Sequence, residues 1–333
     1  MKTILIIGAG QAGLSLSYFL QKHAIDHLIL EKDRPFSTWH TRWDTFRLNT
    51  ANWMNTLPGT TREFVPNAHP NDIPTKSDAL AYFHHYLTTT GPPIQENTNV
   101  TRIEQRPDSL WTVTTTRDTY QTPNIAICTG YASHPKHPSV ASQVPPHIPQ
   151  LHTADYRNPA QIPTPNALAV GSGSSGIQIC EDLARSNRFQ TLYLATSKNP
   201  VIPWHVLGIP IGAFPRQIPF FDIQRSTSLG EHIHRGMQKQ GDPAIAPSPK
   251  TLAKKYGVIL TGKVTAVQNN AVYFQDNRTV SFDDLTIIWC TGFAPNFDLL
   301  HLPNRHTVFS SDGLPQHVRG VVPAAPGLYF LGL

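Results

Sequence analysis

The chain has 333 residues, of which 39% are hydrophobic and 15% charged, enough apolar material for roughly two folded domains. No apolar run approaches the about 18 residues of a membrane-spanning helix, the N-terminus lacks a signal-peptide cleavage site, and the net charge of +5 comes from scattered basic residues. These features favour a cytoplasmic protein and argue against disorder, a membrane span and a nucleic-acid partner.

The first elements in chain order predict a dinucleotide-binding unit. Residues 3–7 are expected to form a buried strand, residues 11–22 a helix and residues 27–31 a second strand. A glycine motif lies between the first strand and the helix, where its glycines would allow a tight turn, close approach of a pyrophosphate and close helix packing. The expected cofactor contacts of this loop are Gly8, Ala9, Gly10, Gln11, Ala12 and Gly13.

A carboxylate follows the second strand at Glu31, 23 residues after Gly8. There it can accept hydrogen bonds from the ribose hydroxyls of a dinucleotide, whereas it would repel a 2′-phosphate. The first site is therefore predicted to hold FAD or NAD and not NADP. Lys32, which follows, and Val100 are also expected to contact this cofactor.

Later segments are less regular. Residues 98–106, 110–116 and 263–276 alternate like exposed antiparallel strands. Residues 135–165 carry eight prolines and are interpreted as an irregular connection. Residues 199–249 are also interrupted by prolines, and a substrate-side insertion is one interpretation of them.

A second dinucleotide unit follows the same plan. Residues 167–170 and 191–195 are expected strands, and residues 175–186 an expected helix. The second strand ends without an acidic residue. Two hydroxyls and a lysine there would suit a 2′-phosphate, so the second site is predicted to hold NADP(H). The alternative is that the lysine is simply a solvated surface residue. The expected contacts are Gly171, Ser172, Gly173, Ser174, Ser175, Gly176, Thr196, Ser197 and Lys198.

Three pairs of similar segments indicate an internal duplication. The glycine motifs are 163 residues apart, two Cys-Thr-Gly segments 162, and two Val-Thr segments 164. The predicted fold is therefore α/β, with two Rossmann-like dinucleotide-binding domains, each a parallel sheet with an antiparallel β excursion. Residues 1–150 and 280–333 are expected to form the FAD-binding domain, and residues 151–279 an inserted NADP-binding domain.

Several further segments resemble the flavin-containing monooxygenase family, the class B flavoprotein monooxygenases, and are most similar to its bacterial YUCCA-like branch. These are the run from Ser37 to Thr50 with Leu57-Pro58-Gly59, the Leu151–Tyr156 segment, which matches the HxxxY half of a family fingerprint, both Cys-Thr-Gly segments, and residues 326–332. Two features depart from the family: Pro146 and Ile148 replace the FxG half of the fingerprint, and the sequence ends at Leu333, where relatives continue into a helix that closes over the flavin.

The resemblance implies residue roles and a reaction. Thr38 and Trp39 would lie along the FAD, and Asn49 and Thr50 near its reactive edge, with Asn49 as the catalytic residue; Thr129, Gly130, Thr291 and Gly292 would border the cofactors. NADPH would reduce FAD, and a flavin 4a-hydroperoxide would then transfer one oxygen atom from molecular oxygen to a small organic substrate.

Alternatives stay open at this point. The same two sites would serve an NAD(P)H-dependent reductase or oxidase without oxygen insertion. Asn49 could equally be a turn residue, while Trp43 is interpreted as a core aromatic. No metal is expected, because no histidine group has a recognised ligand spacing, and the three separated cysteines, with no CxxC, argue against a dithiol centre. An oligomer is possible.

Overall fold

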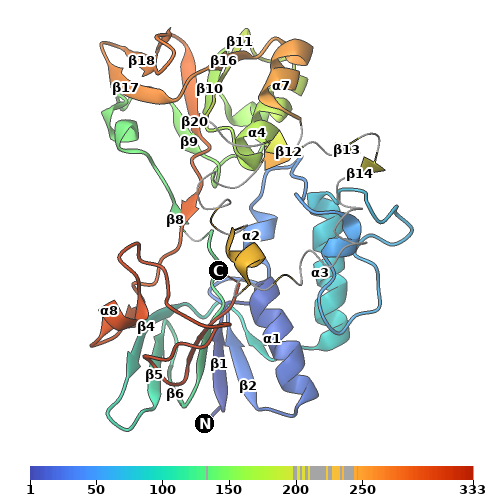
Figure 1. The fold of residues 1–333 in the computed structure, drawn as a ribbon, viewed down its shortest axis with the longest axis vertical. Coiled ribbons are helices and arrows are strands. Elements are labelled where there is room, and N and C mark those ends of the chain that lie inside the picture. Colours follow the sequence, from blue (N-terminus) through green and yellow to red (C-terminus); the bar gives the residue numbers. More distant parts are fainter. Residues whose placement is uncertain are drawn as a thin grey trace.

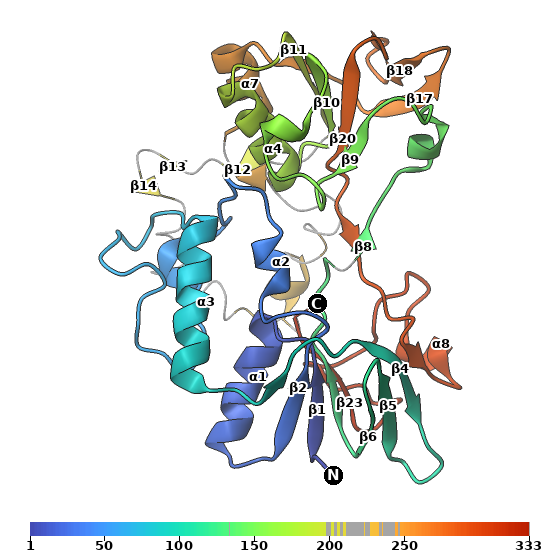
Figure 2. The same ribbon diagram turned by 180° about the vertical axis from the view of Figure 1, so that it is seen from behind.

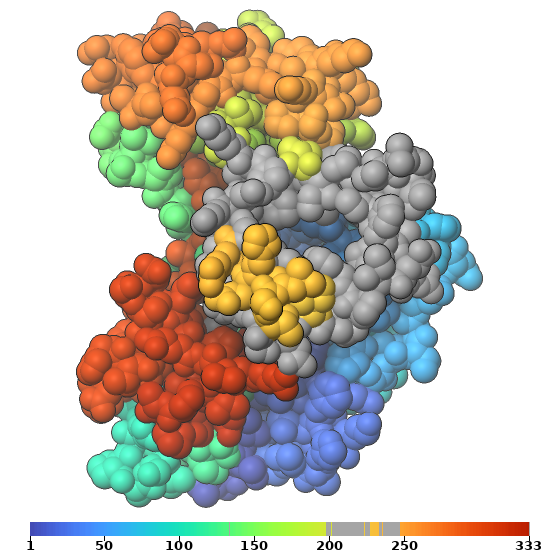
Figure 3. Space-filling view, viewed as in Figure 1, coloured from blue at the N-terminus to red at the C-terminus, as the bar shows by residue number. Residues whose placement is uncertain are grey.

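The computed structural model describes residues 1–132, 134–197 and 247–332, and between these last two ranges only residues 201–202, 205–206, 209–210, 223, 227–232, 235 and 244–245. The chain forms two α/β units, one above the other in Figure 1, joined where strand β8 lies. The surface narrows on that side in Figure 3. Within the described residues, no helix combines the length and the apolar character needed to cross a bilayer.

The first unit is built on a five-stranded parallel sheet in the order β23-β7-β1-β2-β3. Its central strand is buried on both faces, which explains the unbroken apolar sequence Ile4–Ile7. Helices α1 and α3 lie on the same side of this sheet (Figure 2). The bounds are β1 (Ile4–Ile7), α1 (Gln11–Lys22), β2 (His27–Leu30), α2 (Ser37–His40), α3 (Lys76–Thr90), β3 (Ile94–Gln95), β7 (Ile125–Ile127) and β23 (Leu328–Phe330).

The long helix α3 has clear local start and stop signals. Thr75 caps its N-terminus in a capping box with Asp78, and Gly91, at φ 53°, ends it in a left-handed conformation. The aromatic face of α3 packs on the segment after β2, where Phe36 stacks on Phe83 with ring centroids 3.8 Å apart. This packing holds the segment after β2 against helix α3.

An antiparallel excursion extends from the first unit, as the alternating sequence predicts. Strands β4, β5 and β6 pair in antiparallel order, and β22 joins β4 from the far end of the chain. Their bounds are β4 (Val100–Gln105), β5 (Trp111–Thr115), β6 (Thr119–Thr122) and β22 (Leu300–His301). The chain therefore returns to the first unit after passing through the second.

The second unit repeats the plan with a parallel sheet in the order β16-β11-β10-β20-β9. Helices α4 and α7 pack together beside this sheet, and a small antiparallel sheet β17-β18-β19 forms its excursion. The bounds are β9 (Gln150–His152), β10 (Asn166–Val170), α4 (Ser174–Arg185), β11 (Thr191–Ala195), α7 (Pro249–Tyr256), β16 (Ile259–Thr261), β17 (Val264–Gln268), β18 (Ala271–Phe274), β19 (Thr279–Ser281) and β20 (Leu285–Trp289).

Two sequence expectations need correction. The expected return to the first unit at residue 280 is too early, because β20 (Leu285–Trp289) pairs with β10 inside the second sheet. Residues 135–165 are not only a connection, because β9 forms an edge strand of that sheet. Much of the proline-interrupted stretch 199–249 lies outside the described residues.

The remaining short elements connect these units. The crossing between them is a two-stranded antiparallel ladder, in which Phe293 pairs with Pro135 and Ala294 with His134. The bounds are η1 (Asn52–Met54), β8 (His134–Pro135), η2 (Ser139–Gln143), η3 (Pro159–Gln161), β12 (Val201–Ile202), β13 (His205–Val206), β14 (Ile209–Pro210), β15 (Ala244–Ile245), β21 (Phe293–Ala294) and α8 (Arg305–Val308).

Candidate active site

The first glycine loop turns tightly between β1 and α1. Gly8 has φ +106°, and a Cβ there would lie 2.7 Å from the carbonyl oxygen of Cys128 on the neighbouring strand connection. A Cβ on Gly13 would collide with the carbonyl oxygen of Gly8. These two glycines are therefore required by the protein's own packing.

Gly10 differs, because a Cβ built on it meets no atom of the described residues within 4 Å. Gly10 is also the N-cap residue of α1, and no side chain caps this helix end. The start of α1, from Gln11 and Ala12 onward, thus faces open space with backbone N–H groups that an anion can occupy. The open space at Gly10 is what a pyrophosphate on this helix requires.

Glu31 is oriented beside this loop. Its side chain is 6% exposed, and its Oε2 accepts a hydrogen bond from the backbone N–H of Ala9 at 2.7 Å, while Oε1 accepts one from Asp33 N at 3.1 Å. A carboxylate has further lone pairs for two ribose hydroxyls. Lys32 is exposed, whereas the side chain of Val100 packs into the core of the unit.

Thr129 lies beside the same loop. It follows Cys128 at the loop, and its Oγ1 is buried without a hydrogen-bond partner among the described residues. A buried hydroxyl without a partner costs free energy that a bound ligand can offset. Gly130 then turns the chain at φ +76°. The donor set around the first loop therefore fits a dinucleotide.

The second glycine loop reproduces the first. Gly171 has φ +116°, a Cβ on it would collide with the carbonyl oxygen of Cys290, and a Cβ on Gly176 would collide with Gly171. Gly173 is the N-cap of α4, again without a side-chain cap. Ser174 and Ser175 form the first turn of this helix. The second unit thus also has a helix that begins at a glycine loop without a side-chain cap.

The residues expected at a 2′-phosphate lie next to the second loop. Ser197 N donates to Ser172 Oγ at 3.1 Å, which joins the end of β11 to the glycine loop. Thr196 Oγ1 donates to the carbonyl oxygen of Thr261 at 2.9 Å and keeps only acceptor capacity. Lys198 lies outside the described residues.

The segment 36–50 crosses from the first loop to the second unit. It starts where Phe36 N donates to Ala9 O at 3.1 Å, and helix α2 within it lies between the units in Figures 1 and 2. Thr38 is exposed, and Trp39 packs edge-on against Phe46. Trp43 is fully buried in the core of the second unit, which confirms its interpretation as a core aromatic.

Asn49 is exposed and belongs to the junction of the two units. Its Oδ1 accepts a hydrogen bond from Gln178 Nε2 of α4 at 3.3 Å. The neighbouring Thr50 instead closes a local turn through Oγ1, which donates to Asn55 Oδ1 at 2.5 Å. Sequence reasoning missed Gln178, because no local pattern connects residues 129 positions apart.

Thr291 and Gly292 lie in the crossing between the units. Thr291 Oγ1 donates to Lys136 O at 2.5 Å, and Gly292 O accepts from Lys136 N at 3.0 Å. His152 Nε2 also approaches Gly292 O at 3.0 Å. These two residues join the crossing strands, so their described hydrogen bonds are structural.

The cysteines provide no dithiol. All three are buried free thiols, and burial raises the pKa of Cys128 and of Cys180 to about 12. Burial raises the pKa of Cys290 as well. Such thiols stay protonated and unreactive near neutral pH. Among the described residues, no three His, Cys, Asp or Glu side chains gather in a group that could hold a metal ion.

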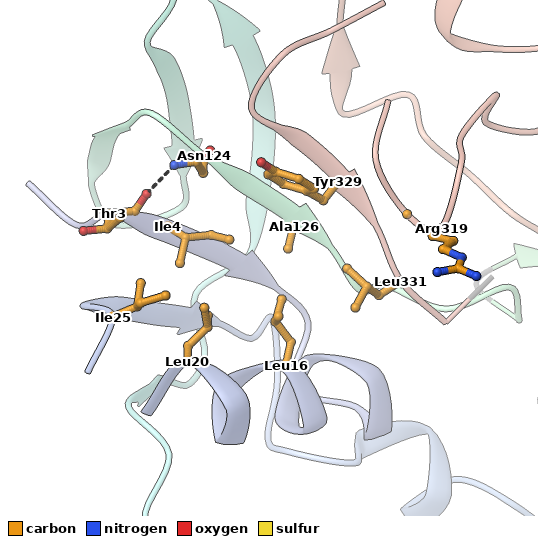
Figure 4. A pocket seen from close by; sticks show the side chains of 11 residues that line it. Thr3, Ile4, Leu16, Leu20, Ile25, Asn124, Ala126, Arg319, Tyr329 and Leu331 are labelled. Atoms are coloured by element: carbon orange, nitrogen blue, oxygen red, sulfur yellow. Dashed lines mark hydrogen bonds between the residues drawn. The ribbon is translucent and has the colours of Figure 1, made fainter. Parts of the chain in front are cut away.

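A pocket of about 380 Å³ opens beside α1, away from these residues. Figure 4 shows its mostly apolar lining, with Leu16 and Leu20 of α1 facing Ile4 and Ala126 of the sheet. Thr3 O accepts from Asn124 Nδ2 at 3.0 Å at one end. None of the predicted cofactor residues lines this pocket.

Two Rossmann-type units, each with a helix that begins at a glycine loop without a side-chain cap, and one segment hydrogen-bonded to both define the class of oxidoreductases built to hold two dinucleotides. The chain belongs to the pyridine nucleotide-disulphide oxidoreductase family, whose model matches residues 5–201. Because its three cysteines are separated and buried, the residues of a dithiol centre are missing from this member of the family.

Individual relatives agree. The chain is 31% identical to an uncharacterized oxidoreductase from Geobacillus kaustophilus, over 99% of this chain and 90% of that protein. It is 24% identical to the indole-3-pyruvate monooxygenase YUCCA8 of Oryza sativa, and the match covers 88% of this chain and 76% of that protein. A flavin-containing monooxygenase from Stenotrophomonas maltophilia has the same fold, with a TM-score of 0.75 at 20% identity, covering 100% of this chain and 91% of that one. The resemblance to flavin monooxygenases is confirmed.

Proposed function

We propose that the chain is an FAD- and NADPH-dependent monooxygenase that inserts one oxygen atom into a small organic substrate. The observation that carries this proposal is the segment 36–50, which is hydrogen-bonded to the first glycine loop at Ala9 and to α4 of the second unit at Asn49. The segment therefore reaches from the proposed flavin loop, at Phe36, to the proposed nicotinamide unit, at Asn49. The similarity to a named flavin-containing monooxygenase and to YUCCA8 supports the same assignment.

The first unit is the proposed FAD site. The start of α1 would bind the pyrophosphate, because positive charge of the helix dipole and free N–H groups gather there. Glu31, held by Ala9 N and Asp33 N, would accept the ribose hydroxyls. The unpartnered hydroxyl of Thr129 would gain a hydrogen bond to the ligand.

The second unit is the proposed NADPH site. The start of α4 would bind the second pyrophosphate, as α1 does the first. The sequence places no acidic residue directly after β11, where Ser197 lies beside the loop residue Ser172, unlike Glu31 at the first site. Lys198 adds a positive charge at this point of the sequence.

FAD, when bound, would supply the redox chemistry, accepting hydride from NADPH and then reacting with molecular oxygen. The protein would orient the ligands and exclude water. With its Oδ1 engaged by Gln178, Asn49 has two N–H groups on Nδ2 for the reacting ligands. Trp39 and Phe46, packed edge-on, would form part of the apolar wall beside it.

The test begins with purified protein. We expect it to carry visible flavin absorbance, to be reduced faster by NADPH than by NADH without oxygen, and to consume oxygen and NADPH in step with product when a reactive organic substrate is supplied. Lys198→Glu should narrow the coenzyme preference by about thirtyfold, since a lost contact and added repulsion are each worth roughly 1 kcal/mol. Equal reduction by both coenzymes in the unaltered protein would contradict the NADPH assignment.

The alternative is a reductase or oxidase without oxygen insertion, and the ratio of products separates it. A monooxygenase converts most of the NADPH consumed into oxygenated product. An oxidase releases one hydrogen peroxide for each NADPH with every substrate offered, and that result would exclude our proposal.

A further inference from the structure

Phe36 lies in a backbone conformation that a bulky residue rarely adopts. Its φ of 58° and ψ of 27° fall in the left-handed region. Most of the described non-glycine residues with positive φ are Asn or Asp, and Phe36 is the one aromatic residue among them. Its side chain is buried, at 2% exposure. A strained residue of this kind persists only where the surrounding contacts hold it in place.

The contacts that hold Phe36 come from helix α3. Its ring stacks on that of Phe83, with centroids 3.8 Å apart and planes 8° from parallel. The same Phe83 meets Trp39 edge-on, at 5.1 Å between centroids. Phe36 is the N-cap residue of α2 and Trp39 lies within that helix. One buried ring of α3 therefore contacts the short helix α2 at two points, and the two helices lie side by side in Figure 2.

The strained turn is also joined to the first glycine loop. Phe36 N donates to Ala9 O at 3.1 Å, and Ala9 N donates to Glu31 Oε2 at 2.7 Å. Ala9 stands between Gly8 and Gly10, so both backbone groups of a central loop residue are held from outside the loop. If Phe36 left its position, the carbonyl oxygen next to Gly10 would lose its donor at the place where the pyrophosphate is expected.

The choice of phenylalanine at position 36 shows what keeps the turn formed. A glycine there would adopt the left-handed conformation at no steric cost, but it would have no ring to stack on Phe83. Phenylalanine has the steric cost and offsets it with the aromatic contact. The population of the turn, and with it the hydrogen bond to Ala9 O, thus depends on a side chain of α3.

We propose that Phe83 is a positioning residue for FAD. By stacking on Phe36 it keeps the turn in the left-handed conformation, and through Ala9 this fixes the glycine loop in the arrangement that binds the cofactor. Phe83 acts through the turn and not by contact with FAD. This assignment rests on the proposed function, because that function places FAD on the first loop.

The test is the dissociation constant of FAD, measured by dilution of each purified full-length holoenzyme and the fluorescence of the released flavin, well below all melting temperatures. Phe36→Ala removes the ring and keeps the steric cost of the left-handed turn, so we expect FAD to bind about tenfold more weakly. Phe36→Gly removes the same ring without that cost and should weaken FAD by no more than about threefold. Phe83→Leu stays apolar but cannot stack and should weaken FAD by about fivefold.

Tyr86→Phe is the matched control from the buried face of α3. It removes the hydrogen bond that Tyr86 Oη donates to Pro58 O at 2.9 Å, one helical turn away from Phe83. We expect a lower melting temperature with unaltered FAD affinity. A role in stability alone would leave the FAD affinity of the Phe36 and Phe83 variants unaltered as well.

Several results would overturn the proposal. Unaltered FAD affinity in Phe36→Ala and Phe83→Leu, equal weakening in Phe36→Ala and Phe36→Gly, or weakening in Tyr86→Phe as large as in Phe83→Leu would each do so. If Phe83→Leu fails to fold, the comparison of alanine with glycine at position 36 decides the question. An unaltered protein that binds no FAD would overturn this assignment and the proposed function together. The expected FAD affinities without oxygenated product would support the positioning role and contradict only the monooxygenase reaction.

Discussion

The side chain of Gln178 hydrogen-bonds both backbone groups of Arg47, across the junction between the two units. Its Oε1 accepts from Arg47 N at 3.1 Å, and its Nε2 donates to Arg47 O at 3.0 Å. The same Nε2 reaches Asn49 Oδ1 at 3.3 Å. Since Gln178 lies two residues after the last glycine of the second loop, the helix that would bind NADPH also holds the proposed catalytic residue.

Gln178→Ala removes all three of these hydrogen bonds. We expect FAD content to stay unchanged while the ratio of hydrogen peroxide to oxygenated product rises by about fivefold, given roughly 1 kcal/mol for an exposed hydrogen bond. The measurement is hydrogen peroxide formed per NADPH consumed with a coupled substrate. Gln21→Ala is the matched control, because Gln21 also donates to backbone carbonyls from a helix, but within the first unit. A similar effect in both variants would mean that Gln178 acts only through stability.

Asn49→Ala tests the catalytic assignment itself. Because Asn49 is exposed, folding and FAD content should be retained. Coupling of NADPH use to product should fall by on the order of 100-fold, the effect of losing one positioned donor. Asn55→Ala serves for comparison, because Asn55 closes the local turn through Thr50 Oγ1 and Ala51 O. If Asn49→Ala loses FAD and stability as we expect of Asn55→Ala, Asn49 is a turn residue and not a catalytic one.

The first glycine loop allows cofactor binding to be separated from folding. Gly10→Val should leave the melting temperature of the apoprotein nearly unchanged, because a Cβ there meets nothing in the described part of the chain within 4 Å and the backbone is extended, at φ −86° and ψ −172°. The same variant should purify without flavin. Gly13→Ala should lower the melting temperature of the apoprotein, because its Cβ would collide with Gly8 O. Stoichiometric FAD in Gly10→Val would refute the placement of FAD on this loop.

Much of this architecture could be predicted from the sequence, because the features involved are local. A buried apolar strand, a glycine turn and a helix follow one another in both units, and Glu31 stands at a fixed distance from Gly8. The edge strand β9 was missed because only three residues, Gln150–His152, pair among many prolines. The expected domain boundary at residue 280 was wrong because β20 pairs with β10 in the second sheet. The apolar sequence of β20 predicts a buried strand, but it does not show which of the two sheets the strand joins.

The site itself could be predicted only in part. Thr129, expected from its Cys-Thr-Gly segment, has the buried hydroxyl that a ligand would satisfy. Thr291, expected from the matching segment, donates its hydroxyl to Lys136 instead. Gln178 was missed, because its significance depends on contacts between the two units, and such contacts leave no local pattern.

We expect His152 to make the crossing between the units sensitive to pH. Its Nδ1 accepts from Ala154 N at 3.1 Å, so Nε2 is the protonated nitrogen that donates to Gly292 O at 3.0 Å. Burial, and next the charge of His137, lower the pKa of His152 below its ordinary 6.5. A proton on Nδ1 would remove the acceptor that Ala154 N requires.

The sign of the effect follows from this lowered pKa. The unfolded chain takes up a proton near pH 6.5, before the folded chain does, so the contribution of His152 to stability is full above pH 6.5 and is lost as the pH falls below it. We expect the melting temperature of the unaltered protein to drop between about pH 7 and pH 5.5. The melting temperature of His152→Gln, which has no titrating group at position 152, should drop by less over the same range. His84→Gln, at an exposed position on α3, should follow the unaltered protein. Parallel pH profiles for His152→Gln and the unaltered protein would show that His152 does not titrate in this range.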